Sequence, residues 1–141
     1  MNLYLDTSAL VKLYVAEVHS SAVRRWVDRS DTVASSRVAY PEARAALARR
    51  RREGALSATA LRRAVAALAR DFPSIVVVEI TEQLSRDAGE LAERRALRGF
   101  DAIHLASALE IARILGAAPL FLAYDARMTE AAALEGLRAP D

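Results

Sequence analysis

Four acidic side chains stand where an apolar segment of the chain meets a new element. Asp6 directly follows the apolar run LYL, and Asp125 follows the run PLFLAY. Glu42 comes after Pro41 near a predicted helix start, and Asp101 stands at the head of a long apolar stretch. Carboxylates that share a pocket repel one another, by roughly 4 kcal/mol for a pair about 4 Å apart at an effective dielectric of about 20. If these four side chains meet, they must take up protons, move apart or bind a cation.

The type of cation follows from the donor atoms. The chain contains no cysteine, so a thiolate site is excluded and the candidate ligands are carboxylate oxygens. Oxygen donors suit hard cations such as Mg²⁺, with Mn²⁺ as a substitute. The four acids therefore predict a Mg²⁺ site, provided that the fold brings their segments together.

Each acid also has a simpler interpretation. A single Asp before a helix commonly caps its N-terminus, which would account for Asp6, Asp101 or Asp125 taken alone. Glu42 could instead stabilise a helix dipole. Ser8 could cap the helix that follows Asp6, or its hydroxyl could contact a cation or a phosphate. The joint placement of the acids favours a site over four separate roles.

The arrangement of strands and helices decides whether the acids meet. The hydrophobic pattern predicts helices that separate and follow four strands, at 2–5, 32–34, 74–80 and 119–124. Such alternation is typical of an α/β fold in which helices cover both faces of a parallel sheet. Ligands of these sheets bind outside the carboxyl ends of the strands, where Asp6 and Asp125 stand and where the following helices begin. The pattern therefore places all four acids at one edge of the sheet.

Several local features can be predicted in the same way. The run at 74–80 is nearly continuous in apolar, mostly β-branched residues, which is typical of a strand covered on both faces. Ser57 and Thr81 are predicted to cap helices. The helix that begins after Thr81 is expected to end near Gly99, and a buried helix is expected over 102–115.

Composition limits the class of protein. A length of 141 residues suits a single domain over 1–141, and the absence of cysteine is typical of a reducing compartment. The N-terminus MNLYLD has no basic segment and meets an acid at once, so no signal peptide is predicted. No uncharged run approaches the roughly 20 residues of a membrane span. A soluble, cytoplasmic protein without a membrane partner is expected.

The charge is small in total but unevenly distributed. The chain has 20 basic and 18 acidic residues, a net charge of +2, and a pI of 9.4 that reflects its nearly complete use of arginine. Residues 44–70 contain eight arginines against Glu53 alone, a local charge of +7 that leaves −5 for the rest. A chain polarised in this way could meet a polyanion with one part and bind cations with another.

The residues around the four acids resemble a known family. The segments DTSALVKLY, PEARAAL, FDAIHLASAL and AYDARMTEAA stand in the order and approximate spacing of the PIN domain, and are most similar to VapC-type toxins of bacterial toxin–antitoxin pairs. DTSALVKLY followed about ninety residues later by GFDAIHLASA is a specific combination. The resemblance implies a three-layer α/β/α sandwich with a central parallel sheet. It also implies a metal-dependent ribonuclease that acts on RNA, commonly as a homodimer held by a partner antitoxin.

By matching position, Asp6, Glu42, Asp101 and Asp125 would form the catalytic acidic quartet of this family. Mg²⁺ held there could activate a water molecule and neutralise the leaving oxygen of an RNA phosphodiester. Asp6 and Asp101 are the expected direct ligands, whereas Glu42 and Asp125 would bind through water or orient the nucleophile. Relatives often carry Thr or Ser two residues before the last acid. This chain departs from that pattern with Ala123, which has no hydroxyl to contribute.

Two other functions fit parts of the pattern. A catalytically idle PIN-like module that binds RNA or a partner would be favoured by the loss of one acid, but all four are present. A metal-dependent phosphatase or phospho-acceptor domain could use Asp6. A phosphatase of that kind would usually carry a second Asp two residues later, where Ser8 stands.

Two groups of residues near the acids have less specific interpretations. His104 follows Asp101 by three residues on a largely apolar helix and is predicted to be a hydrogen-bonded structural histidine. The four arginines at 49–52 surround the end of a helix, where cations are favourable. They are expected to contact the RNA backbone or an acidic antitoxin segment, or simply to be solvated. These arginines are Arg49, Arg50, Arg51 and Arg52.

Overall fold

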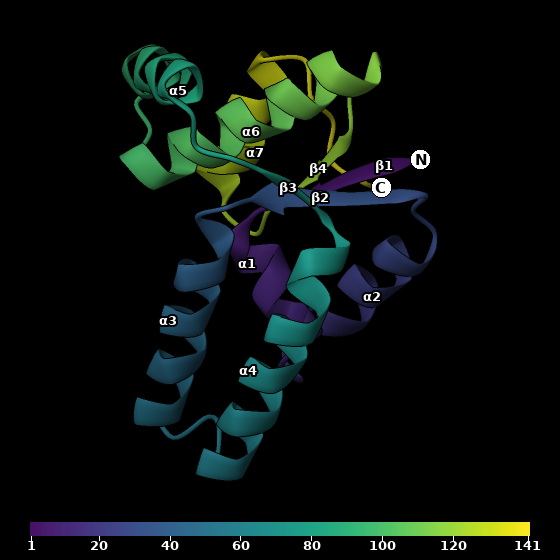
Figure 1. Cartoon of the computed structure of the whole chain (residues 1–141), viewed down its shortest axis with the longest axis vertical. Coiled ribbons are helices and arrows are strands. Elements are labelled where there is room, and N and C mark those ends of the chain that lie inside the picture. The colour runs from purple at the N-terminus through teal and green to yellow at the C-terminus, as the bar shows by residue number, and fades with distance from the viewer.

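The computed structural model describes all 141 residues and places a four-stranded parallel sheet between two layers of helices (Figure 1). The strand order is β3-β2-β1-β4, and every neighbouring pair is parallel. This arrangement confirms the predicted three-layer α/β/α sandwich. The strands are β1 (Asn2–Leu5), β2 (Thr32–Ser36), β3 (Val76–Val78) and β4 (Leu120–Leu122).

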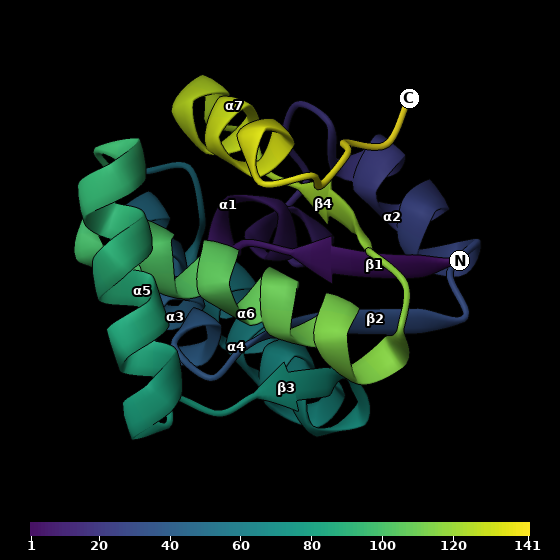
Figure 2. The ribbon, with the colours of Figure 1, turned by 90° about the horizontal axis from the view of Figure 1, so that it is seen from above.

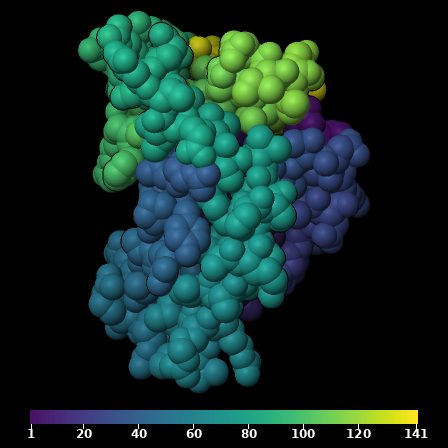
Figure 3. All heavy atoms as spheres, viewed as in Figure 1, coloured from purple at the N-terminus to yellow at the C-terminus, as the bar shows by residue number.

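Helices fill both layers. One face of the sheet is covered by α5 (Glu82–Arg95), α6 (Gly99–Leu115) and α7 (Ala126–Leu134), as Figures 1 and 2 show. Under the other face lie α1 (Thr7–Leu10), which continues into the 3₁₀ turn η1 (Val11–Leu13), and α2 (Ser20–Asp28). The same layer holds the long pair α3 (Ala39–Arg52) and α4 (Ala58–Asp71), the latter followed by the turn η2 (Phe72–Ser74). Helices α3 and α4 run away from the sheet and form the lower lobe of the space-filling view (Figure 3).

The central strand β1 supplies both hydrophobic cores. Leu3 and Leu5 are fully buried in the core that packs against α1 to α4, whereas Tyr4 is fully buried in the core formed with α5, α6 and α7. This division follows from the period of two in a strand, which sends successive side chains to opposite faces. Burying a large apolar side chain contributes roughly 1.5–3 kcal/mol, so β1 is fixed from both sides.

Two of the predicted elements differ from those in the structure. The apolar run at 74–80 forms only the three-residue strand β3, and it lies at the edge of the sheet with Val76 44% exposed. The prediction of a strand covered on both faces is therefore wrong. The helix after Thr81 ends at Arg95, where Ala96 takes a left-handed conformation, and Gly99 instead begins α6. The boundary prediction failed because a non-glycine residue terminates the helix.

The predicted caps are confirmed. The Ser57 hydroxyl accepts a hydrogen bond from the backbone N–H of Ala60, and the Thr81 hydroxyl accepts one from that of Leu84. Each satisfies an N–H that the first turn of a helix leaves without a partner. None of the helices combines the length and the apolar character that crossing a membrane requires.

Candidate active site

The candidate site lies outside the carboxyl ends of β1 and β4. The chain passes outward from β1 to β2 and β3, and then returns to the far side of β1 as β4. Ligands of open α/β sheets bind at such a reversal. Asp6 directly follows β1, and its backbone N–H donates to the carbonyl of Leu122 in β4 at 3.1 Å. Asp125 follows β4 and caps α7 through a hydrogen bond from the N–H of Arg127 (2.9 Å).

An open cavity of about 570 Å³ joins the first turns of three helices at this edge. Glu42 comes from the first turn of α3, Asp101 from the first turn of α6, and Asp125 from the start of α7. Two arginines and an exposed phenylalanine complete the charged and aromatic part of the lining: Arg98, Arg127 and Phe100. Three of the four predicted acids therefore share one cavity, while Asp6 is buried outside its lining.

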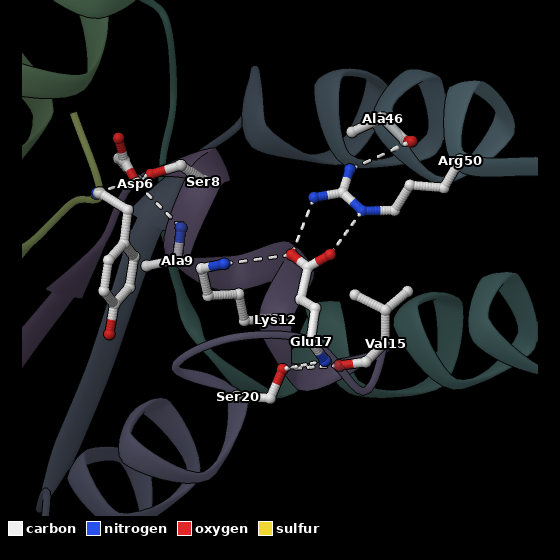
Figure 4. Close-up of polar contacts among 10 residues, drawn as sticks. Asp6, Ser8, Ala9, Lys12, Val15, Glu17, Ser20, Ala46 and Arg50 are labelled. Atoms are coloured by element: carbon white, nitrogen blue, oxygen red, sulfur yellow. Dashed lines mark hydrogen bonds and ion pairs between the residues drawn. The ribbon is translucent and has the colours of Figure 1, made fainter. Parts of the chain in front are cut away.

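Asp6 is held by one of its two carboxylate oxygens (Figure 4). Its Oδ1 accepts hydrogen bonds from the Ser8 hydroxyl (2.6 Å) and from the N–H of Ala9 (3.0 Å), whereas its Oδ2 has no partner. No buried side-chain oxygen of the protein lacks a partner, so Oδ2 must reach solvent. Burial raises the pKa of Asp6, and the negative charge of Asp101 adds to that rise. Ionising Asp6 is therefore costly unless a cation approaches Oδ2.

Glu42 shows the same division of its two oxygens. Its Oε1 accepts a hydrogen bond from the Thr7 hydroxyl (2.6 Å) and lies 2.8 Å from Nε2 of His104. Its Oε2 has no partner and, by the same reasoning, reaches solvent. Partial burial alone would raise the pKa of Glu42, but the contacts with His104 and Thr7 outweigh it and lower the pKa. Glu42 is therefore an ionised carboxylate with one oxygen available to a ligand.

Asp101 has no hydrogen-bond partner of its own. Partial burial raises its pKa, and the carboxylates of Asp125 and Glu42 raise it further. Glu42, Asp101 and Asp125 line the same cavity, so their charges lie near one another. Even so, no three His, Asp or Glu side chains of the protein are disposed to hold a single metal ion between them. The acids surround the cavity without closing on one point, so metal binding by the quartet stays a prediction.

Two of the four acids do cap helices, as the simpler interpretation of each acid predicts. These are Asp6 and Asp125, and Asp125 also lines the cavity. Asp101 is not a cap, because the N-cap of α6 is Arg98 and Asp101 lies within the first turn. Ser8 is not a cap either: it lies inside α1, donates to Asp6 and accepts from the N–H of Tyr124 at 2.9 Å.

His104 is a buried, fully hydrogen-bonded histidine, as predicted, but it contacts the site. Its Nδ1 lies 2.9 Å from the Tyr4 hydroxyl, and its Nε2 lies near both Glu42 and Thr7. Sequence reasoning missed Tyr4 and the exposed rim formed by Arg98 and Phe100. The alternation of β1 does carry a signal for Tyr4, because residues 4 and 6 share one face of a strand.

The arginines at 49–52 lie far from this cavity. Glu42 and Arg50 are eight residues apart on α3, which corresponds to about 12 Å along a helix. Arg50 is engaged by Glu17, whose carboxylate also accepts a hydrogen bond from Lys12 at 3.1 Å (Figure 4). Arg49 pairs with Glu53. Only the exposed Arg51 and Arg52 make no ion pair.

Known proteins resemble this chain in sequence and in fold. A sequence model of the PIN domain matches residues 3–134. Ribonuclease VapC49 of Mycobacterium tuberculosis is 44% identical over 108 residues, covering 77% of this chain and 75% of the relative. Ribonuclease VapC46 of the same species is 36% identical over 135 residues, covering 96% of this chain and 93% of the relative.

Two solved structures resemble the fold. The crystal structure of Mycobacterium tuberculosis VapC20, described as a toxin that cleaves the sarcin–ricin loop, has a TM-score of 0.68 at 22% identity and covers 92% of this chain and 94% of its own. That of PAE2754 from Pyrobaculum aerophilum has a TM-score of 0.67 at 20% identity and covers 99% of this chain and 83% of its own. The PIN model extends over the segments that carry all four acids. Together with the identity to the two ribonucleases, this match shows that the chain belongs to the PIN domain family and, within it, to the VapC-type toxin ribonucleases.

Proposed function

We propose that this protein is a divalent-metal-dependent endoribonuclease, the toxin of a type II toxin–antitoxin pair. The observation that carries the proposal is the shared cavity of Glu42, Asp101 and Asp125, with the free oxygen of Asp6 at the adjacent strand end. Relatives of 36–44% identity bear the name ribonuclease, which supports the same reaction class. An idle module is less well supported, because no acid of the quartet is missing.

The donor atoms suit a hard divalent cation, although the side chains do not converge on one point. The donors are all carboxylate oxygens. Asp6, Glu42 and Asp125 each keep one oxygen without a partner, and Asp101 keeps both. Burial and acidic neighbours raise the pKa of Asp101. A cation would relieve that repulsion. Asp6 and Asp101 would bind it directly, and Glu42 and Asp125 would do so directly or through water. Mg²⁺ is the expected ion, with Mn²⁺ as a substitute.

The residues of the cavity can orient the attacking water and bind the RNA. When bound, Mg²⁺ would lower the pKa of water and neutralise charge on the leaving oxygen. Glu42 and Asp125 can accept a hydrogen bond from the attacking water and so orient it toward the phosphorus. Arg98 and Arg127 stand at the rim without ion pairs and can hold the flanking phosphates. Phe100, which is 59% exposed beside them, offers a flat surface on which an unpaired base can stack.

Cleavage of RNA by the purified protein is expected only with added Mg²⁺ or Mn²⁺, and excess EDTA should abolish it. Since water is the nucleophile, the products should carry 5′-phosphate and 3′-hydroxyl ends. A 2′-O-methyl group at the cut site should therefore still permit cleavage, provided that it fits the cavity. The measurement is end-group mapping of a labelled RNA. Undiminished cleavage in EDTA, or 2′,3′-cyclic phosphate ends, would contradict the metal mechanism.

RNA binding is expected to depend on the arginines at the rim and not on those at the far end of α3. The double variant Arg98→Gln/Arg127→Gln should weaken the binding of a single-stranded RNA and flatten its salt dependence. Each lost phosphate contact removes about 0.7 from the slope of log K against log salt. Fluorescence anisotropy in EDTA, where no cleavage is expected, gives affinity and slope together.

The matched control is Arg51→Gln/Arg52→Gln, which removes the same charge from exposed arginines that also make no ion pair. Its affinity and salt slope should stay close to those of the unchanged protein. The opposite result, with a flattened slope only in the control variant, would move the RNA path to α3. Equal effects in both variants would show that these arginines act on RNA binding only through the net charge of the protein, and not through contacts at a particular site.

A cognate antitoxin and a homodimer complete the proposal. Both are carried over from the VapC-type family, since the structure contains one chain. At the far end of α3, Arg51 and Arg52 make no ion pair. This end of the helix is the surface that we expect an acidic antitoxin segment to contact. If it binds one, the Arg51→Gln/Arg52→Gln variant should release the inhibitor faster while its RNA affinity is unchanged.

A further inference from the structure

A chain of hydrogen bonds leads from the core of the protein to the cavity. It begins at the hydroxyl of Tyr4, a residue of β1 that is fully buried between the sheet and α6, and passes to Nδ1 of His104 at 2.9 Å. The opposite ring nitrogen, Nε2, lies 2.8 Å from Oε1 of Glu42 and 2.9 Å from the hydroxyl of Thr7. Thr7 also donates to Oε1 at 2.6 Å. The hydrolysis described above makes no use of Tyr4, Thr7 or His104.

In this series of hydrogen bonds, each group can be assigned as donor or acceptor without conflict. A carboxylate can only accept, so the nitrogen of His104 that faces Glu42 must carry a proton. In a neutral ring Nδ1 then has a lone pair, which the Tyr4 hydroxyl can satisfy by donating. The Thr7 hydroxyl donates to the same oxygen of Glu42. Each group is satisfied in this scheme, and no buried side-chain polar atom lacks a partner.

The result is a carboxylate anchored by one oxygen only. Both contacts of Glu42 fall on Oε1, which leaves Oε2 for the cavity that Glu42 lines. Asp6 repeats the pattern, since Ser8 and Ala9 both donate to its Oδ1. Glu42 has one more rotatable side-chain bond than Asp6. It therefore needs hydrogen bonds that restrict its rotamers if the same oxygen is always to face the cavity.

We infer that His104 and Thr7 are positioning residues that hold Glu42 with Oε2 directed into the cavity, and that Tyr4 fixes the proton of His104 on Nε2. This inference rests on the proposed nuclease function. It assigns no direct contact with RNA or cation to these three residues. Their contribution is to fix the orientation of a ligand or water-orienting group before the substrate arrives.

The sharpest test compares His104→Gln with His104→Asn. Glutamine extends its amide nitrogen to about the position of Nε2 and can still donate to Glu42, whereas asparagine is too short to reach. Partners of this kind typically change metal affinity by about 10–100-fold when removed. The Asn variant should therefore bind Mn²⁺ about tenfold or more weakly, measured by paramagnetic resonance of the free ion without RNA. The Gln variant should stay within a few-fold.

Thr7 offers a second conservative pair. Thr7→Ser keeps the hydroxyl that donates to Glu42, and Thr7→Val removes it with little change of shape. The serine variant should retain Mn²⁺ affinity and the valine variant should lose it. Melting temperature in EDTA must accompany each measurement, because all these groups are partly or fully buried. Losses of affinity that merely follow losses of stability in both members of a pair would show a structural role and overturn the inference.

One measurement is independent of metal and RNA. The chain has only two histidines, so ¹⁵N labelling of histidine in the metal-free protein yields two sets of ring signals. The set that disappears in His104→Gln belongs to His104, and it should show a protonated Nε2 and an unprotonated Nδ1. A proton on Nδ1 alone would overturn the inference whether or not the protein cleaves RNA. Conversely, an Nε2–H tautomer in a protein that neither binds Mn²⁺ nor cleaves RNA would defeat the proposed function alone.

Discussion

Asp101→Asn is expected to lower the rate of RNA cleavage by at least about a hundredfold. Removing a group that merely orients a metal ligand costs about 10–100-fold, so removing the charge of a direct ligand should cost at least as much as the upper value. Asparagine is close to aspartate in size, and Asp101 neither caps α6 nor accepts a hydrogen bond. The substitution therefore changes charge with little change of structure. Single-turnover cleavage at saturating Mg²⁺ measures the effect.

The same substitution should leave metal-free protein as stable as before, or make it more stable. Burial and the carboxylates of Asp125 and Glu42 raise the pKa of Asp101 above its ordinary value. A raised carboxyl pKa means that the folded state binds the proton more tightly than the unfolded state, so stability is lost as pH rises through the folded pKa. Asparagine avoids that loss at neutral pH. Its advantage should diminish as pH falls through the raised pKa of Asp101 and vanish below roughly pH 4, the ordinary range of an aspartate, where the carboxyl group is protonated in both the folded and the unfolded state.

Asp28→Asn is the matched control, because Asp28 is exposed at the end of α2 and makes no side-chain hydrogen bond or ion pair. It should leave cleavage and melting temperature in EDTA nearly unchanged. If Asp101→Asn instead retains full turnover, Asp101 is not a ligand, and the site must be rebuilt around the other acids. A loss of turnover together with a large loss of stability would point to misfolding.

The position of the acids could be read from the sequence because it depends on local order along the chain. Asp6 ends an apolar strand and Asp125 follows another, and parallel strands necessarily bring such ends to one edge. Helix α3 follows β2, so Glu42 in its first turn lies at that edge. Helix α6 follows α5 and precedes β4, so it must start near the same edge, with Asp101, to return the chain to the beginning of a parallel strand. The same reasoning cannot tell an edge strand from a central one. The composition of the run at 74–80 is typical of a central strand. Its position at the edge of the sheet depends on which strands pair in space, and the local sequence does not show that.

Contacts between side chains distant in sequence could not be predicted. Tyr4 and His104 are 100 residues apart, and nothing in either local sequence identifies the other as a partner. Arg50 illustrates the same limit. It looks like one member of a free basic cluster, but it pairs with Glu17, 33 residues earlier, as Figure 4 shows. Pairing of Arg49 with Glu53 and of Arg50 with Glu17 thus leaves two of the four arginines without an ion pair.

Divalent cations alone are expected to raise the melting temperature of the protein without any RNA. A ligand at 100 times its dissociation constant stabilises the folded state by about 2.7 kcal/mol. For a chain of this length, that corresponds to a rise of roughly 5–10 °C. The physical reason is that a cation relieves the burial cost at Asp6 and the repulsion at Asp101, which raise the pKa of both groups. Differential scanning calorimetry with Mg²⁺, Mn²⁺ or EDTA measures the shift.

The dependence of this shift on pH separates site binding from general screening. Protons and cations compete for the same carboxylates, so the rise in melting temperature should diminish as pH falls through the raised pKa values of Asp6 and Asp101. The double variant Asp6→Asn/Asp101→Asn should lose the shift while remaining folded, because asparagine caps a helix about as well as aspartate. Asp28→Asn should keep the shift, and NaCl of equal ionic strength should not produce it. A shift of full size in the double variant would show that the stabilising cation binds outside the four acids, because the charges held responsible for it would then be absent.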